Sequence, residues 1–315
     1  MGTQYALPIE MLQKWAKEKP NAVYLSQPVN REYVKFTWAE CYDAVRRMAT
    51  ALQSMGFQPG DRIGILAKNC AEWFLADFAI QAAGFVSAPI YYTASADTIS
   101  YIVDHADVKA VFMGKLDDLA PSEAGIRDGV VKIGFPYETI DCEYSWTELL
   151  KAHEPIAEDQ IAKPDLEDLF SVVYTSGSTG NPKGVEVSYR NIAFGAWSPT
   201  QTLELDGDER MISYLPLAHI TERALVEHVS VYAGVVVSFV ESLDSFPEDL
   251  RAADVSMFIS VPRLWMKFQA GILAKLPQEK LDRFLKIPGL SWYVKRKIRN
   301  QLGLSKAKII GSGSA

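Results

Sequence analysis

Short apolar runs alternate with longer helical patterns along most of this chain, and this alternation limits the fold more than any other feature. The apolar run at residues 62–66 is followed by helical patterns over 71–83 and 96–106, and then by the run at 110–113. Alternating strands and helices are typical of a mostly parallel, doubly wound sheet with helices on its faces. The sequence therefore predicts an α/β fold.

Local signals set the ends of several elements. Thr37 precedes a helical pattern at residues 38–55, and Glu40 stands three residues after it, which predicts a capping box. Residues 78–96 carry no charge and are long enough to span a membrane. Gly84 and Pro89 interrupt this stretch, so we expect a buried helix end, a turn and a short strand instead.

Composition excludes several classes of protein. The chain has 315 residues, of which 48% are apolar and 23% charged, as in a soluble globular protein. A net charge of −7 argues against a general nucleic-acid binder, which would carry a basic surface. The three cysteines are widely spaced and odd in number, so they predict neither a disulfide framework nor a zinc site. They fit a reducing, cytoplasmic setting.

The segment at residues 174–184 reads Tyr-Thr-Ser-Gly-Ser-Thr-Gly-Asn-Pro-Lys-Gly. Glycines let backbone amides approach an anion closely, while hydroxyl groups and a lysine add donors and positive charge. This composition predicts a loop that binds a polyphosphate. The loop is not the common P-loop, because Lys183 follows Pro182 and is followed by Gly184.

The same pattern resembles the phosphate loop of the adenylate-forming (AMP-binding) superfamily, which includes acyl-CoA synthetases, luciferases and adenylation domains of peptide synthetases. Segments at residues 56–62, 214–223, 261–263 and 311–315 also resemble that superfamily, in the same order. The sequence Leu-Pro-Leu-Ala-His-Ile-Thr-Glu-Arg at residues 215–223 is most similar to the corresponding segment of long-chain fatty acyl-CoA synthetases. The likeness covers essentially the whole chain.

The resemblance implies two similar α/β subdomains with mostly parallel sheets flanked by helices, as in the large N-terminal domain of the acyl-CoA synthetase/luciferase-like fold. Residues 53–199 would form one subdomain, ending in the phosphate loop. Residues 1–52 and 200–315 would form the other, which is discontinuous and incomplete at its C-terminal end. The small C-terminal domain of the family would be absent.

The resemblance also implies a two-step reaction with ATP, Mg²⁺ and CoA. A carboxylate attacks the α-phosphorus of ATP to give an acyl-adenylate and pyrophosphate, and the thiol of CoA then displaces AMP. Thr175 matches the position that also helps to hold Mg²⁺. The residues expected to bind the phosphates are Thr175, Ser176, Gly177, Ser178, Thr179, Gly180 and Lys183.

Further site residues follow from the same likeness. His219 would orient the substrate carboxylate, and Gly311 and Gly313 would bring backbone close to adenine and the acyl chain. Arg223 is a candidate substrate residue at a place where a related bacterial enzyme has an aromatic gate. Arg263 follows a proline, and it is either a substrate contact or a solvated charge near a helix start.

Residues 275–308 carry ten Lys or Arg against two acidic residues, with aromatic residues among them. A basic amphipathic segment in an acidic chain suggests peripheral contact with the inner face of an anionic membrane. A solvated helix face is the alternative reading.

The chain ends inside a segment that continues in the family, and the family's later magnesium-binding Glu, ribose-binding Asp and catalytic Lys are not found. We therefore expect a truncated ligase that is inactive alone, whereas the full-length protein would activate a fatty acid. Two alternatives stay open. One is a non-catalytic module that binds nucleotide or acyl chain. The other is an adenylating ligase that uses an aryl or medium-chain acid or a carrier-protein acceptor.

Overall fold

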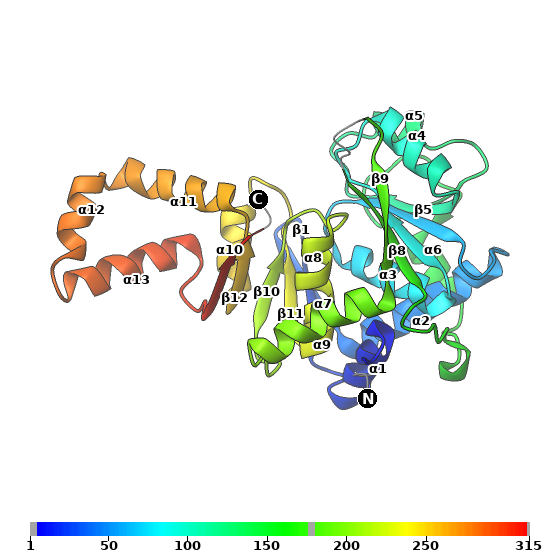
Figure 1. The fold of residues 1–315 in the computed structure, drawn as a ribbon, viewed down its shortest axis with the longest axis horizontal. Coiled ribbons are helices and arrows are strands. Elements are labelled where there is room, and N and C mark those ends of the chain that lie inside the picture. Colours follow the sequence, from blue (N-terminus) through cyan, green and yellow to red (C-terminus); the bar gives the residue numbers. More distant parts are fainter. Residues whose placement is uncertain (1–4, 176–179, 314–315) are drawn as a thin grey trace.

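The computed structural model describes residues 5–175 and 180–313, whose strands form one large, one medium and one small sheet (Figure 1). The strands are β1 (Val23–Val29), β2 (Glu32–Thr37), β3 (Arg62–Ala67), β4 (Val86–Pro89), β5 (Val108–Gly114), β6 (Val131–Gly134), β7 (Tyr144–Ser145), β8 (Leu169–Thr175), β9 (Lys183–Ser188), β10 (Arg210–Ser213), β11 (Val236–Phe239), β12 (Met257–Ser260) and β13 (Ile309–Ser312).

The sheets are mostly parallel. The seven-stranded sheet has the order β7-β6-β5-β3-β4-β8-β9, and only the β8–β9 pair in it is antiparallel. The four-stranded sheet has the order β10-β11-β1-β2, so it combines two strands near the N-terminus with two strands from residues 210–239. Strands β12 and β13 form a parallel pair that lies next to β10. The predicted α/β fold with mostly parallel sheets is confirmed.

Helices cover both faces of the large sheet and link the sheets. The helical segments are α1 (Pro8–Glu18), α2 (Trp38–Ser54), α3 (Ala71–Ala83), α4 (Ala96–His105), α5 (Ala120–Gly125), α6 (Trp146–Ala152), η1 (Glu158–Gln160), α7 (Tyr189–Thr202), α8 (Ile220–Glu222), η2 (Arg223–His228), α9 (Val229–Ala233), α10 (Phe246–Ala253), α11 (Pro262–Lys275), α12 (Gln278–Leu285) and α13 (Leu290–Leu302).

Helix α3 lies in the interior. All thirteen of its residues are buried, and it contacts β1 of one sheet as well as β3 and β4 of the other. A helix that is apolar on every side is stable only when it is surrounded by protein. One continuous core therefore joins the two larger sheets through α3. Helices α4 and α5 cover the opposite face of the large sheet, over a second core cluster.

The predicted local signals are confirmed. The Thr37 hydroxyl accepts a hydrogen bond from the Glu40 amide at 3.2 Å, and the Glu40 carboxylate accepts one from the Thr37 amide at 2.7 Å. Gly84, at φ +86°, ends α3, and β4 follows directly. Within residues 5–175 and 180–313, no helix combines the length and apolar character needed to cross a membrane.

The helical segment over residues 220–233 is not a regular α-helix. It begins as α8, widens into the π-helical segment η2 and continues as α9. Arg223 is the first residue of η2, and its side chain is held by groups from other elements.

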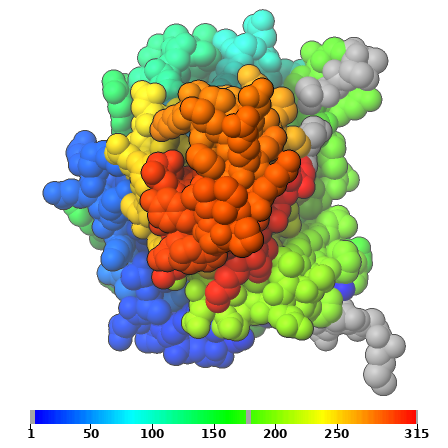
Figure 2. Space-filling model, turned by 90° about the vertical axis from the view of Figure 1, so that its left-hand side faces the viewer, coloured from blue at the N-terminus to red at the C-terminus, as the bar shows by residue number. Residues whose placement is uncertain are grey.

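Helices α11, α12 and α13 form an arm at one end of the molecule (Figures 1 and 2). Only Val294 among the residues of these three helices is buried. The arm begins directly after β12 and leads back to β13, so the small sheet forms its base.

Candidate functional site

The predicted phosphate loop connects the two strands of the β8–β9 hairpin. Thr175 and Lys183 are paired across the hairpin at the point where the strands separate, and both are exposed. The predicted residues Ser176, Gly177, Ser178 and Thr179 lie outside the described residues. Gly180 has φ +129°, a conformation that favours glycine, and apart from its chain neighbours no atom of a described residue lies within 4 Å of where its Cβ would be. The hairpin thus presents one hydroxyl and one ammonium group side by side.

A tyrosine–histidine pair supports the base of this hairpin. The Tyr174 hydroxyl lies 2.8 Å from His105 Nδ1, and the His105 ring stacks on Tyr101. Burial raises the pKa of Tyr174 to about 12, so the phenol stays neutral at physiological pH. This contact could not be predicted from the sequence, because the two partners are 69 positions apart.

His219 occupies an exposed N-cap position at the start of α8. Its Nδ1 accepts a hydrogen bond from the Thr221 amide at 3.2 Å. In the neutral ring the proton is then on Nε2, which is left to donate a hydrogen bond outward. This geometry suits a ring that binds an anionic group such as a carboxylate.

Glu222 connects the His219 segment, which consists of His219 and helix α8, to the end of β10. Its carboxylate accepts hydrogen bonds from the Tyr214 amide at 2.9 Å and from the Ser213 hydroxyl at 3.0 Å. The Ser213 hydroxyl also accepts a hydrogen bond from Asn69 at 2.7 Å. Burial raises the pKa of Glu222 to about 8. Because its carboxylate is buried and both of these partners lie at the end of β10, Glu222 links its own segment to that strand.

Arg223 connects the same segment to the large sheet and α3. Its guanidinium pairs with Asp77 at 2.5 Å and donates hydrogen bonds to the hydroxyls of Ser87 and Ser171 at 2.6 Å. The cation also lies over the Phe170 ring, 4.4 Å from its centroid. The expected role of Arg223 as a substrate residue does not agree with this position. The side chain has no exposed surface, and its described partners are all groups of the protein.

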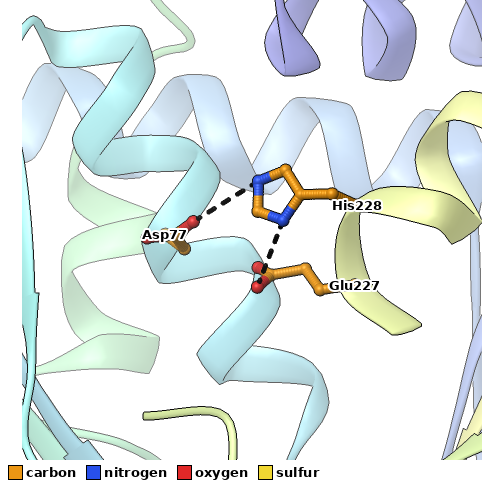
Figure 3. A group of neighbouring side chains, drawn as sticks. All are labelled: Asp77, Glu227 and His228. Carbon is orange, nitrogen blue, oxygen red and sulfur yellow. Dashed lines mark ion pairs between the residues drawn. The ribbon is translucent and has the colours of Figure 1, made fainter. Parts of the chain in front are cut away.

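Glu227 and His228 complete this buried cluster (Figure 3). His228 Nε2 lies 4.0 Å from Asp77, and its Nδ1 lies 3.7 Å from Glu227 and 3.0 Å from the Arg223 carbonyl. Burial lowers the pKa of His228 to about 4, so the ring is neutral at pH 7. Burial and the charge of Asp77 raise the pKa of Glu227 well above its usual range.

Among the described residues, Asp77, Glu227 and His228 form a group whose spacing could hold a metal ion. The charges of the cluster favour a protonated Glu227 over a bound metal ion. Arg223 already neutralises Asp77, so a protonated Glu227 leaves the cluster neutral. A divalent ion with Glu227 ionised would leave one net positive charge buried, at a large desolvation cost.

The segment with Gly311 and Gly313 lies at the base of the arm. Gly311 pairs with Ile259 across β12–β13, and the Gly313 amide donates to the Ser260 carbonyl at 3.1 Å. Gly311 also lines an open cavity of about 340 Å³ together with Pro262 and Trp265. Arg263 is exposed in the first turn of α11 and is not among the residues lining this cavity.

The chain matches the family model described as AMP-binding enzyme over residues 12–314. It is 32% identical to Long chain acyl-CoA synthetase 5 of Arabidopsis thaliana over 78% of this chain and 39% of that protein. It is 29% identical to the human Long-chain-fatty-acid–CoA ligase ACSBG2 over 72% of this chain and 36% of that protein. The chain therefore spans less than half the length of these relatives.

Solved structures share the fold at lower sequence identity. The adenylation domain of a carboxylate reductase from Mycobacterium chelonae matches 98% of this chain and 54% of its own, with a TM-score of 0.76 and 19% identity. The o-succinylbenzoate CoA synthetase of Bacillus subtilis, bound to its acyl-adenylate, matches 99% of this chain and 55% of its own. Its TM-score is 0.70 and its identity 21%.

Proposed function

Because the chain belongs to the AMP-binding enzyme family, we propose that it forms the phosphate-binding part of a ligase that joins a carboxylic acid to CoA at the expense of ATP. The observation that carries this proposal is the β8–β9 hairpin, which presents Thr175 and Lys183 on either side of a loop rich in glycine and hydroxyl groups.

The residues of the hairpin suit the first step, in which the carboxylate attacks the α-phosphorus of ATP. Lys183 supplies a positive charge for the phosphate oxygens, where negative charge accumulates as pyrophosphate leaves. Gly180 leaves space for a phosphate to approach the backbone. The Thr175 hydroxyl is an oxygen ligand of the kind that Mg²⁺ prefers. The bound ion would neutralise phosphate charge.

His219 is proposed to orient the acid for this attack. Its Nδ1 is fixed as an acceptor, so the Nε2 proton is available to the substrate carboxylate. Glu222 and Arg223 follow in the chain and are buried, so they hold the His219 segment in place. The acyl-adenylate would then react with the thiol of CoA.

We propose a long-chain fatty acid as the substrate. The support is that both sequence relatives reported above are named as long-chain fatty acid ligases. The structural neighbours include enzymes named for other acids, so they support the fold but not the chain length.

Calorimetric titration of the chain with ATP and Mg²⁺ tests the phosphate site. We expect Lys183→Ala to weaken ATP binding about ten- to hundredfold, because one charge-assisted contact contributes about 1.5–3 kcal/mol. Lys163→Ala is the matched control, since Lys163 is an exposed lysine before β8. Equal ATP affinity of the two variants would refute the proposed role of Lys183.

The substrate proposal is tested with non-hydrolysable acyl-sulfamoyl adenosines that carry hexadecanoyl, octanoyl or benzoyl groups. A long-chain ligase binds the hexadecanoyl compound most tightly. Tighter binding of the benzoyl compound would identify an aryl-acid ligase instead. Binding of ATP with no preference for any acyl group would favour a module that binds nucleotide only.

A further inference from the structure

The helices of the arm line a partly open apolar cavity that the proposed adenylation site does not use. The cavity has a volume of about 550 Å³ and is bounded by α10, α11, α12 and α13. Most of its wall is apolar, including Phe246, Phe268, Ile272, Phe284 and Ile298. Its size falls within the range of about 300–1,000 Å³ that is typical of small-molecule pockets.

The mouth of this cavity is basic. Lys275, Lys297 and Tyr293 line the cavity and also line an adjoining open groove of about 660 Å³. Arg251 and Arg296 add two more cations to the groove. The apolar cavity thus opens directly into a groove that carries four positive charges.

These cations lack carboxylate partners. None of Lys275, Arg296 and Lys297 forms an ion pair with any residue in the described part of the chain. Arg296 lies over the Trp292 ring at 5.1 Å, and within the described part of the chain the Arg251 side chain donates to the Gln301 backbone carbonyl alone, at 3.4 Å. Four neighbouring cations without counter-charges attract an anionic group.

The two parts of the site require different chemistry from one ligand. A nucleotide or inorganic anion would neutralise the groove but leave the apolar cavity unfilled. A neutral lipid would fill the cavity but leave the cations without a partner. A long-chain carboxylate satisfies both, because its chain can be buried while its head group stays at the wet, basic mouth.

We propose that the arm binds a monomeric long-chain carboxylate, with the acyl chain in the cavity and the carboxylate at Lys275 and Lys297. This site is separate from the proposed adenylation site, since no residue of the β8–β9 hairpin and no part of the His219 segment lines it. The arm would therefore hold an acyl chain in addition to the one that reacts.

Calorimetry without nucleotide tests the proposal, with dodecanoate below its micellar concentration and methyl dodecanoate as the uncharged probe. We expect the double variant Lys275→Ala/Lys297→Ala to bind dodecanoate at least tenfold more weakly and methyl dodecanoate unchanged. The double variant Lys35→Ala/Lys163→Ala is the control, because it removes two exposed lysines from outside the arm. Decanoate should bind the wild-type chain more weakly than dodecanoate, by about fourfold for each methylene removed.

A second variant tests the cavity without deleting a core side chain. Gly271 lines the cavity, and no atom lies within 4 Å of where its Cβ would be. Gly271→Leu should fill part of the cavity and weaken both dodecanoate and its methyl ester at least tenfold. Ala270→Leu, at an exposed position of the same helix that does not line the cavity, should leave both affinities unchanged.

Several outcomes would overturn the proposal. Dodecanoate affinity that changes in neither the lysine variant nor Gly271→Leu rules out this site. Pelleting with phosphatidylserine vesicles, combined with no binding of monomeric dodecanoate, would assign the basic arm to a membrane surface instead. Loss of dodecanoate binding in Lys183→Ala would place the bound acyl chain at the adenylation site. Because ATP binding is measured separately, failure of this proposal leaves the proposed function unaffected.

Discussion

Arg223 should contribute more to folding stability than any exposed arginine of this chain, and the substitution Arg223→Met tests this. The guanidinium pairs with Asp77 at 2.5 Å, and both side chains are completely buried. It also donates hydrogen bonds to Ser87 and Ser171, so three elements depend on one side chain. Methionine keeps much of the volume and flexibility of arginine but carries no charge.

The size of the effect follows from what the substitution leaves behind. Removing one partner of a buried ion pair leaves an uncompensated charge and costs about 3–5 kcal/mol. Asp77 would retain its hydrogen bond from Gln81 at 3.0 Å, but it would lose its counter-charge. We therefore expect Arg223→Met to lower the free energy of unfolding by about 4 kcal/mol.

Urea denaturation followed by tryptophan fluorescence measures this change, with the midpoint and slope compared between variants. The control is Arg127→Met. Arg127 pairs with Asp104 at 2.7 Å, but the two side chains are 46% and 59% exposed. Exposed pairs contribute about 0–1 kcal/mol, so this control should change stability little.

A double variant separates the ion pair from the packing around it. Asp77→Leu/Arg223→Met removes both charges, so it should be more stable than Arg223→Met alone, as found when buried ion pairs are replaced by apolar groups. If Arg223→Met costs no more than the Arg127→Met control, the pair with Asp77 is not a major source of stability and our reasoning is wrong.

Two further predictions concern single side chains. Burial raises the pKa of Glu222 to about 8 from an ordinary 4.5, so its carboxyl favours folding most at low pH, and that contribution is lost as pH rises from 4.5 to 8. Glu222→Gln should remove this pH dependence. The unfolding free energy of the variant minus that of the wild type should therefore rise by about 1.4 kcal/mol per pH unit between pH 4.5 and 8. A difference that stays constant from pH 5 to 8 contradicts the raised pKa of Glu222. Thr37→Ala should lower the unfolding free energy by about 1 kcal/mol through loss of the N-cap of α2. Ser145→Ala is its control, because the Ser145 side chain makes no capping hydrogen bond, and equal effects of the two substitutions would contradict the capping argument.

The sequence was most informative where the structure depends on nearby residues. The capping box of Thr37 and Glu40 spans three residues, so its pattern can be read directly from the chain. The strand–helix alternation predicted a mostly parallel sheet for the same reason. The phosphate hairpin was recognisable because a single loop supplies its glycines, hydroxyls and Lys183.

The role of Arg223 could not be predicted in this way. Its partners Asp77, Ser87 and Ser171 lie between 52 and 146 residues away, and only the fold brings them together. A weaker signal was present. Asp77 stands within an otherwise apolar stretch of α3, and a charge in a buried helix requires a partner. The sequence could therefore have predicted that a partner exists, but not which residue it is.

Glu222 and Arg223 are adjacent in the chain, yet they join the His219 segment to different parts of the molecule. Glu222 holds the end of β10 through Ser213 and the Tyr214 amide. Arg223 holds β8 through Ser171, four residues before Thr175 of the phosphate hairpin. Neither link is exposed, so moving His219 relative to the hairpin would break buried hydrogen bonds, each at a cost of about 1–3 kcal/mol. Buried hydrogen bonds therefore link the proposed carboxylate-orienting group to the strand that leads into the phosphate hairpin before any substrate binds, as a preorganised site requires.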